Sequence, residues 1–484
     1  MSTQATRADD LLVSSNFIRA VRESGYLNIA TALAELIDNS LQATATDVSV
    51  TISRDTADAF PEIVVEDNGT GMSKAELEFC LRFGGSSRFD ARQSFGRFGM
   101  GLPAASLSQA RRVEVTSWQS GGYESTVALD VDAIVAGSGP TLVAHRGAHS
   151  TSESGCRVRW IQCDRIEYRR LAWLGKSLHR DLGRMYRRFL VAGLNITING
   201  VPVIAVDPML LTTKIEGATA RLAFDELQYE LETTEGGTSF VKVRFATLPL
   251  QRWHHLDSVT KRRLGIVGGG GVSILRAGRE IARGWHLMGR KRKENYDDWW
   301  RCEIEFEPSL DEHFGITNNK QGIRPSATLR EAIEPELESI ARLLNARVRQ
   351  AFENVKLQAV SEASCRIAAA ADSDLPVITS RGRGGAIQYR LGSDVLPMDV
   401  MFQSTLAQRT LDLTLNADHP AFAALYQPLQ ALECGTVAEQ LRTSIELFLL
   451  SFARSAVQLE RAGQPLNDLI QAWSSTYRRM LQKS

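Results

Sequence analysis

The chain has 484 residues, of which 43% are hydrophobic and 23% are charged, and its formal net charge is +0 at pH 7. This composition is typical of a globular protein rather than a disordered or membrane protein, and it is sufficient for two or three domains with hydrophobic cores. The apolar run at 445–453 contains a glutamate and is far shorter than the roughly 20 residues that a membrane helix needs, so no membrane partner is expected. The six cysteines form no C-x-x-C pair, which argues against a zinc site or a disulfide framework and favours a cytoplasmic location.

Residues 1–210 alternate between helical and strand patterns, and we expect them to form the first domain. The segment 195–200 ends in Asn-Gly, which is a strong signal for a hairpin turn. The predicted elements of this domain are helices at 27–44, 76–83 and 168–190 and strands at 47–52, 62–66, 112–118 and 195–200.

Residues 211–355 are predicted to form a second α/β domain, and residues 356–484 a third domain that is mainly helical. Pro202 and Pro208 mark the first boundary. The predicted elements are strands at 240–246, 272–275 and 302–306 and a helix at 328–355 in the second domain, and a strand beginning at Leu411 and helices at 437–459 and 466–481 in the third.

Glu35 and Asn39 lie four residues apart on the first long predicted helix, and therefore on one of its faces. A carboxylate can orient or deprotonate a water molecule, and an amide oxygen can ligate magnesium without adding charge. Asp38 lies beside them in the sequence but points in a different direction. The alternative interpretation is an ordinary polar face of a helix in solvent.

Asp67, Gly69 and Gly71 directly follow an apolar strand. The glycines allow a tight turn and a close approach of the backbone to a ligand. The aspartate can accept a hydrogen bond from an exocyclic amine such as that of adenine. Because Asp-Asn-Gly is also common turn chemistry, a plain strand-to-helix turn is the alternative.

Gly96, Gly99 and Gly101 have the spacing G-x-x-G-x-G and precede a helix predicted over 103–110. A glycine-rich segment before a helix N-terminus can hold phosphate through backbone N–H groups. The segment lacks the Gly-Lys-Ser/Thr of a Walker loop, and it does not follow a first strand as a Rossmann loop does. A single loop of this kind is weak evidence for a nucleotide.

Together and in this order, the three motifs resemble those of the GHKL ATPases, the superfamily of gyrase, heat-shock chaperone, histidine kinase and MutL. The resemblance implies an α+β fold whose first domain is a Bergerat-type ATP-binding sandwich. It implies that Glu35 is the general base for the attacking water, that Asn39 is a magnesium ligand and that Asp67 binds the adenine amine. The carboxylate of Glu35 separates the chain from the histidine-kinase branch. Further nucleotide contacts are implied for Gly69, Gly71, Met72, Ser86, Ser87, Gly96, Arg97, Phe98, Gly99, Met100, Gly101 and Leu102.

The chain departs from the family at one position of the adenine pocket. GHKL proteins often carry Gly-Thr on a later strand, where the threonine hydroxyl helps to hold adenine, and the corresponding place here is Gly155-Cys156. A thiol is a poor hydrogen-bond donor. The resemblance therefore leaves open whether Cys156 contacts adenine or only fills the core.

The resemblance extends to a ribosomal-protein-like transducer domain over 211–355. In related proteins this domain sends a lysine to the γ-phosphate, and Lys320 in the segment 315–321 is the candidate. A turn lysine that faces solvent is the alternative. The segment 272–281 resembles the transducer strand–turn–strand, and the whole resemblance covers 15–355 and is nearest to Microrchidia (MORC)-like bacterial ATPases.

Basic residues gather in three places and indicate a possible nucleic-acid contact. The alternative is a solvated or ion-paired surface, in keeping with the neutral net charge. These residues are Arg165, Arg169, Arg170, Arg180, Arg184, Arg187 and Arg188, the run 290–293 between Trp285 and Trp299, and Arg381 and Arg383.

The sequence thus predicts an ATP-binding and magnesium-dependent ATP-hydrolysing protein. As a member of this family it would work as an ATP-gated homodimeric clamp, with DNA as the expected substrate of the clamp. Two alternatives remain open. One is a chaperone-like ATPase acting on client proteins, and the other is a nucleotide-sensing module with little turnover.

Overall fold

The computed structural model describes residues 14–463, apart from 24, 27, 55, 57–58, 85–99, 138–141, 151–152, 167–169, 235, 317–321, 379–386, 398–399 and 432–435. The chain divides into two compact units. One unit combines Met1–Pro249 with Leu256–Ala341, and the other combines Leu250–His255 with Arg342–Ser484. Within the described ranges, no helix is long and apolar enough to cross a membrane. The domain boundaries at 210 and 355 stay predictions.

The first unit begins with a mixed sheet whose strands follow the order β5-β4-β3-β6-β2-β1-β7-β8. Strands β1 and β7 run parallel, and the other neighbouring strands pair antiparallel. The strands are β1 (Asp47–Ser53), β2 (Glu62–Asp67), β3 (Arg112–Trp118), β4 (Tyr123–Asp130), β5 (His145–His149), β6 (Gly155–Ile161), β7 (Asn195–Ile198) and β8 (Val201–Pro202). The helices of this region are α1 (Ser14–Glu23), α2 (Ile29–Gln42), α3 (Lys74–Phe79), α4 (Gly101–Gln109), α5 (Val131–Val135), α6 (Leu171–Met185) and α7 (Arg187–Val191).

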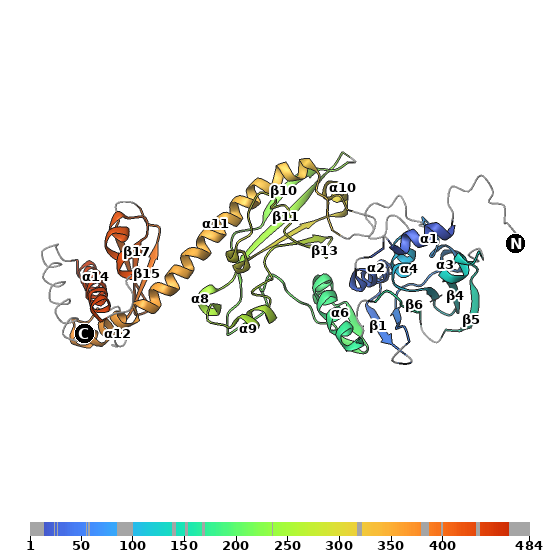
Figure 1. The fold of residues 1–484 in the computed structure, drawn as a ribbon, viewed down its shortest axis with the longest axis horizontal. Helices are drawn as coiled ribbons and strands as arrows, with labels where there is room; N and C mark the ends of the chain where they lie inside the picture. Colours follow the sequence, from blue (N-terminus) through green and yellow to red (C-terminus); the bar gives the residue numbers. More distant parts are fainter. Residues whose placement is uncertain are drawn as a thin grey trace. The chain divides into compact units, whose positions relative to one another are not determined.

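Helices α1, α2 and α4 lie side by side in this region (Figure 1). Helix α2 starts at Asn28, whose side chain accepts a hydrogen bond from the N–H of Thr31 at 2.9 Å and so caps the helix. Most of α2 is buried, so the helix belongs to the core rather than to a solvated face. Under it, β1 buries every second side chain, as expected for a half-buried strand.

Several predicted elements are confirmed in place. The predicted strands at 47–52, 62–66 and 112–118 correspond to β1, β2 and β3. Asn199 and Gly200 both have positive φ angles, 48° and 78°, and they connect β7 to β8 as the predicted hairpin turn. The short helix predicted over 76–83 is α3, which starts earlier because Ser73 and Glu76 form a capping box.

The prediction of one continuous helix over 168–190 is wrong. Helix α6 ends at Met185, and α7 begins at Arg187 after an interruption at Tyr186, which has φ −104° and ψ 15°. The side chain of Tyr186 is fully buried, and its hydroxyl lies 2.7 Å from the carbonyl oxygen of Ala34 on α2. This tertiary contact accompanies a break that helical periodicity alone does not indicate.

A second sheet follows in the same unit, with the strand order β10-β11-β14-β12-β13 and β9 paired to β11. The long helix α11 runs along β10 and β11 (Figure 1), and Tyr229 on β10 donates a hydrogen bond to Glu336 on α11 at 3.0 Å. The strands are β9 (Arg221–Leu222), β10 (Leu227–Glu232), β11 (Thr238–Thr247), β12 (Val272–Arg276), β13 (Arg279–Gly284) and β14 (Trp300–Phe306). The helices of this part of the chain are α8 (Leu250–Trp253), α9 (Ser258–Arg263), α10 (Asp311–Phe314) and α11 (Ala327–Val360). Of these, α8 is assigned to the second unit, and α11 begins in the first unit and continues into the second.

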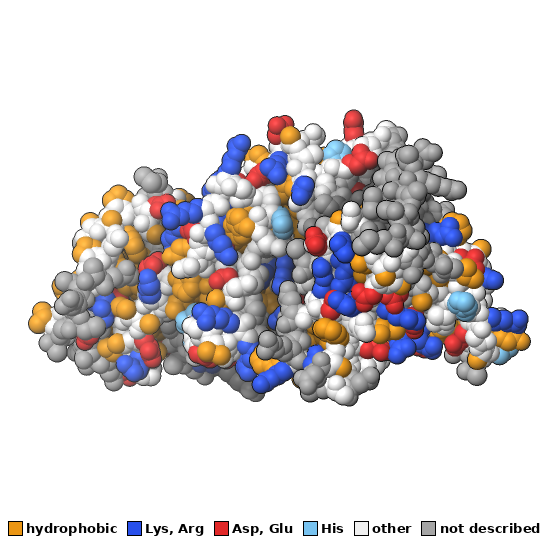
Figure 2. Space-filling model, turned by 45° about the vertical axis from the view of Figure 1, so that its right-hand side comes forward, with side chains coloured by type: hydrophobic (Ala, Val, Ile, Leu, Met, Phe, Trp, Pro, Cys, Tyr) orange, Lys and Arg blue, Asp and Glu red, His pale blue; other side chains and the backbone are white. Residues whose placement is uncertain are grey.

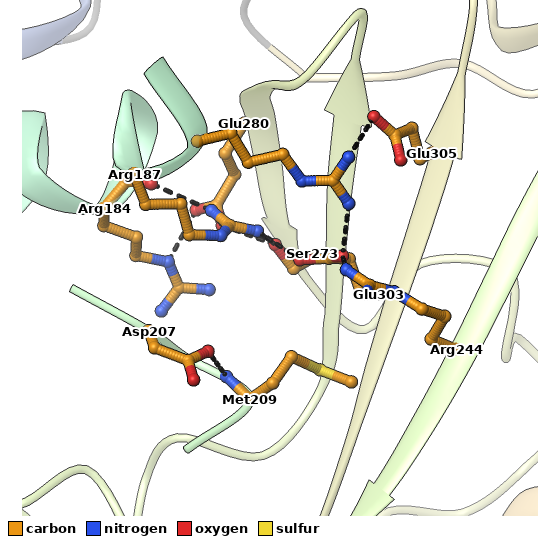
Figure 3. Close-up of polar contacts among 10 residues, drawn as sticks. Arg184, Arg187, Asp207, Met209, Arg244, Ser273, Glu280, Glu303 and Glu305 are labelled. Carbon is orange, nitrogen blue, oxygen red and sulfur yellow. Dashed lines mark hydrogen bonds and ion pairs between the residues drawn. The ribbon is translucent and has the colours of Figure 1, made fainter. Parts of the chain in front are cut away.

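A buried ion-pair network joins α6 and α7 to this second sheet (Figure 3). At its centre, Arg187 contacts Glu280 at 2.8 Å and Glu303 at 2.6 Å, and its guanidinium also donates to the hydroxyl of Ser273 at 3.1 Å. The flanking pairs are Arg184–Glu280, Arg188–Glu303, Arg188–Glu305 and Arg244–Glu303. The contact between the two sheets of this unit therefore relies on matched charges as well as on apolar packing.

This network predicts an acid-sensitive interface. Burial by itself would raise the pKa of Glu303, but the guanidinium groups of Arg187 and Arg244 lower it from 4.5 to about 2. Because the pKa is lower in the folded state, this contribution to stability is present above the unfolded-state pKa and is lost as the pH falls towards 2. We expect Glu303→Gln to lower the free energy of unfolding by on the order of 3 kcal/mol near pH 7, and by much less near pH 2.

Urea unfolding of the wild type and Glu303→Gln over this pH range measures the difference. A difference that stays constant as the pH falls would contradict the assignment of the network as the cause.

The second unit has its own core around a sheet with the order β15-β17-β16. The sheet goes beyond the single strand predicted at Leu411. Inside this core, Arg454 contacts Asp372 at 2.8 Å, and Asp372 accepts a hydrogen bond from Tyr389 at 3.2 Å. The elements are α12 (Glu362–Ala371), β15 (Gln388–Asp394), β16 (Phe402–Ala407), β17 (Thr410–Asn416), α13 (Gln427–Ala431) and α14 (Thr436–Ala462).

Candidate functional site

Helix α2 is the centre of the candidate site. Glu35 is buried, with 3% of its surface exposed, and Asn39 is half-buried one turn later. Their spacing puts both side chains on one face of the helix. The solvated-face alternative does not hold for Glu35, because a carboxylate is rarely buried to this extent without a specific reason.

The last glycine of the glycine-rich segment lies against Glu35. A Cβ atom added at Gly101 would lie 2.7 Å from Oε2 of Glu35. Gly101 is the first residue of α4, so the free N–H groups of this helix N-terminus lie near the carboxylate. A glycine at this position lets the N-terminus of α4 approach α2 closely, and a helix N-terminus is a favourable place for an anion.

Asp67 lies at the end of β2, where two donors fix its carboxylate. The hydroxyl of Ser40 donates to Oδ2 at 2.7 Å, and the backbone N–H of Gly69 donates to Oδ1 at 2.9 Å. Burial raises the pKa of Asp67, and these hydrogen bonds oppose the shift only in part. The carboxylate is thus held in one orientation, and each of its oxygens retains lone pairs for a further donor such as an exocyclic amine.

The turn after Asp67 is pressed against its neighbours. A Cβ atom at Gly69 would lie 2.7 Å from the Cβ of Ala43 at the end of α2. Gly71 has a φ of 67°, and a Cβ there would lie 2.1 Å from the carbonyl oxygen of Trp118. Both positions therefore require glycine for steric reasons, as the motif predicts.

Met72 and Cys156 line the same corner of the fold. The N–H of Met72 donates to the hydroxyl of Ser117 at 2.7 Å, which fixes the strand end beneath the turn. Cys156 is the partner of Asp67 in the β2–β6 register. Burial raises the pKa of the Cys156 thiol well above its ordinary value, so the thiol stays protonated next to Asp67.

The remaining predicted site residues divide into two groups. Met100 and Leu102 flank Gly101 at the start of α4 and are half-buried. The others lie outside the described residues, namely Ser86, Ser87, Gly96, Arg97, Phe98, Gly99 and Lys320.

Neither Ser40 nor the contacts of Asp38 were predicted from the sequence. Ser40 follows Asn39 directly, but a helical serine is common, and its link to Asp67 becomes visible only when α2 and β2 pack together. Asp38 accepts a hydrogen bond at 2.8 Å from Tyr186, which lies 148 residues away in sequence. The signal in the sequence was the polar run Asp38-Asn39-Ser40 in a helix whose other residues are mostly apolar.

The protein side chains could hold magnesium only together with oxygen ligands from a nucleotide and from water. The described residues contain no group of three or more His, Cys, Asp or Glu side chains that could hold a metal ion. Asn39 would therefore supply a protein oxygen, and phosphate oxygens and water would have to complete the coordination, as is common for magnesium.

The predicted basic surface is ion-paired in part where it is described. Arg184, Arg187 and Arg188 are engaged in the network with the second sheet. In the run 290–293, Lys291 is buried and contacts Asp297 at 2.7 Å. Figure 2 shows basic and acidic side chains interspersed over the visible face. Arg169, Arg381 and Arg383 lie outside the described residues.

The comparison with protein families agrees with this geometry. Residues 27–150 match the family model described as "Histidine kinase-, DNA gyrase B-, and HSP90-like ATPase". This range contains Glu35, Asp67 and Gly101, the residues that the structure brings to α2.

Curated relatives match parts of the chain that are 89 to 184 residues long. The chain is 31% identical over 184 residues to the DNA mismatch repair protein MutL of Shewanella woodyi, which covers 33% of this chain and 29% of that protein. It is 32% identical over 89 residues to Protein MICRORCHIDIA 4 of Arabidopsis thaliana, and the match covers 18% of this chain and 11% of that protein. It is 36% identical over 120 residues to the putative type II restriction enzyme HgiDII of Herpetosiphon aurantiacus, and the match covers 23% of this chain and 18% of that protein.

The chain thus spans less than a third of the length of these relatives. The region that the family model matches, 27–150, nevertheless holds all three motifs. With Glu35, Asp67 and Gly101 gathered around α2, residues 27–150 of this chain form a GHKL-type ATPase domain by similarity, and the chain resembles MutL and Microrchidia proteins over part of its length.

Proposed function

We propose that the chain binds ATP with magnesium and hydrolyses it. The observation that carries this proposal is the arrangement around α2. Glu35 lies against Gly101 on one side of the helix. Near the C-terminal end of the same helix, Ser40 fixes Asp67 through a hydrogen bond. Three motifs that are separated in sequence thus meet at one helix, and each brings the chemistry that one part of ATP requires.

Each side chain has a distinct role in this proposal. Asp67 accepts a hydrogen bond from the adenine amine, and Gly101 lets the N–H groups of α4 approach the phosphates. Glu35 orients the attacking water and takes its proton. Asn39 holds magnesium, which, when bound, neutralises charge on the phosphates. Lys320 would contact the γ-phosphate and register its loss.

The second sheet is proposed to be a transducer, and the full protein an ATP-gated homodimeric clamp. The buried network on Arg187 supports mechanical coupling between the ATP-binding region and the second sheet. The residues after 355 are proposed to contact a partner or DNA. The domain boundaries and the cytoplasmic location remain part of the proposal.

DNA is the proposed substrate of the clamp because one of the relatives is named a DNA mismatch repair protein. The ion-paired state of Arg184, Arg187 and Arg188 gives the α6–α7 region little free charge for this contact. A chaperone-like ATPase acting on client proteins is the second candidate, and a nucleotide sensor with little turnover is the third.

Steady-state phosphate release tests the proposal. Wild type and Asn39→Ala are compared with magnesium ATP, with and without duplex DNA. Turnover that depends on Asn39 and magnesium supports the ATPase, and salt-sensitive stimulation by DNA supports the clamp on DNA. ATP binding without turnover would favour the sensor, and absence of ATP binding would disprove the proposal.

The adenine contact gives a separate prediction. Asp67→Asn is expected to weaken ADP binding by roughly 10- to 100-fold, because a hydrogen bond to a charged acceptor contributes about 1.5–3 kcal/mol. The fold should persist, since an asparagine keeps the shape of the side chain and can still bond Ser40. Isothermal titration with ADP measures the change.

Asp132→Asn is the matched control, because Asp132 is 59% exposed and pairs with Arg111 on the surface. Equal affinities of the Asp67 and Asp132 variants for ADP would exclude Asp67 from the adenine site.

A further inference from the structure

A buried ion pair connects the second sheet to the proposed catalytic helix. Oδ2 of Asp38 on α2 lies 3.0 Å from Nη1 of Arg279 on β13, and the side chains are 0% and 4% exposed. The other carboxylate oxygen, Oδ1, lies 2.8 Å from the hydroxyl of Tyr186. The same hydroxyl also lies 2.7 Å from the carbonyl oxygen of Ala34. Asp38 is therefore held from two sides in the core of the first unit.

The hairpin between β12 and β13 brings Arg279 to this place. Ala277 and Gly278 have φ angles of 48° and 81°, the combination required for a tight two-residue turn. A Cβ atom at Gly278 would lie 3.7 Å from the ring of Phe189, so the tip of the hairpin packs against α7. Arg279 follows the tip directly, and its guanidinium lies 5.8 Å from the centre of the Tyr186 ring.

Arg279 carries its charge in this environment. Burial by itself would lower the pKa of Arg279, but the carboxylate of Asp38 and the acidic groups around it raise it above its ordinary value. A buried ion pair of this kind often adds little stability over apolar residues of the same size. Stability alone is therefore a weak explanation for placing this pair next to the candidate site.

Asp38 and Glu35 are neighbours on α2. Residues three apart on a helix lie one above the other, with Cβ atoms about 5–6 Å apart. A movement of the hairpin that shifts Asp38 consequently shifts Glu35 as well. Positioning of a catalytic group is sensitive at this scale, because a displacement of about 1 Å can reduce a rate by about 100-fold.

We propose that Arg279 is a positioning residue: by pairing with Asp38, it joins the second sheet to the helix that carries the catalytic base. This inference rests on the proposed ATPase function. It means that α2 adopts its working geometry for the chemical step when the β12–β13 hairpin is docked.

The test compares Arg279→Met with Arg276→Met in the full chain. Arg276 lies on the other side of the same turn and pairs with Asp311 at 2.6 Å, away from α2, so its loss removes a buried ion pair without affecting Asp38. We expect Arg279→Met to lower kcat by roughly 10- to 100-fold while the Kd for ADP changes by less than about 3-fold. Arg276→Met should keep kcat within about 2-fold, and Arg279→Lys should recover most of the loss because it keeps the charge.

Hydrogen exchange provides a readout that does not need turnover. Without nucleotide, the amides of α2 should exchange faster in Arg279→Met than in the wild type or in Arg276→Met. If Arg279→Met does not fold, the double variant Asp38→Asn/Arg279→Met replaces it, since it leaves no unpaired buried charge. A wild type without phosphate release would disprove the ATPase function, whereas equal exchange in the Arg279 and Arg276 variants would disprove the role of Arg279.

Discussion

Replacement of Glu35 by glutamine is expected to reduce kcat for ATP hydrolysis by roughly 100- to 10,000-fold while ATP binding persists. The carboxylate is buried against Gly101, and glutamine preserves its shape but cannot accept a proton from water. Phosphate release and a nucleotide titration measure the two effects separately. If the protein is an ATP-gated clamp, the variant should also accumulate as an ATP-bound dimer, which light scattering detects.

Glu23→Gln provides the control, because Glu23 is an exposed glutamate on α1 and its replacement should leave turnover unchanged. Wild-type turnover in Glu35→Gln would rule out Glu35 as the base. Slow turnover in a variant that stays monomeric with ATP would leave the base in place and contradict the clamp.

The second large effect concerns the buried network. Arg187→Met is expected to lower the free energy of unfolding by about 3–5 kcal/mol, because it removes the common partner of Glu280 and Glu303 in a buried place. Methionine retains much of the apolar stem of arginine, so the loss reports mainly on the guanidinium group. Urea denaturation followed by tryptophan fluorescence measures the change.

Arg180→Met on the preceding helix α6 is the matched control. Arg180 is 65% exposed and pairs with Asp181 at 3.2 Å, and an exposed pair of this kind contributes at most about 1 kcal/mol. Similar losses in the two variants would show that the arginines of α6 and α7 act through general helix stability and not through the network.

The fold was predictable where local patterns decide it. Alternation identified β1, and Asn199-Gly200 identified the turn after β7. The break at Tyr186 was not predictable, because the partner of its hydroxyl, Asp38, lies 148 residues away in sequence. The same reason applies to β15 and β16, whose pairing depends on β17 rather than on their own periodicity.

The candidate site was predictable where the residue types of a motif directly indicate the local backbone conformation. Gly71 must be glycine because of its φ angle and the nearby carbonyl of Trp118, and the motif contains that requirement. The contact of Ser40 with Asp67 and that of Arg279 with Asp38 are different. Each joins segments from different parts of the chain, and serine and arginine are common enough that neither marks its partner in the sequence.

The charged contact between the α6–α7 region and the second sheet has a consequence for recombination among relatives. An apolar interface accepts many apolar partners, whereas buried charges that meet a partner of the wrong sign cost several kcal/mol. A chimera that takes the second sheet from a relative lacking Glu280 and Glu303 would leave Arg187 without partners. The two halves of the interface must therefore be exchanged together, and during divergence they are constrained to change as a pair.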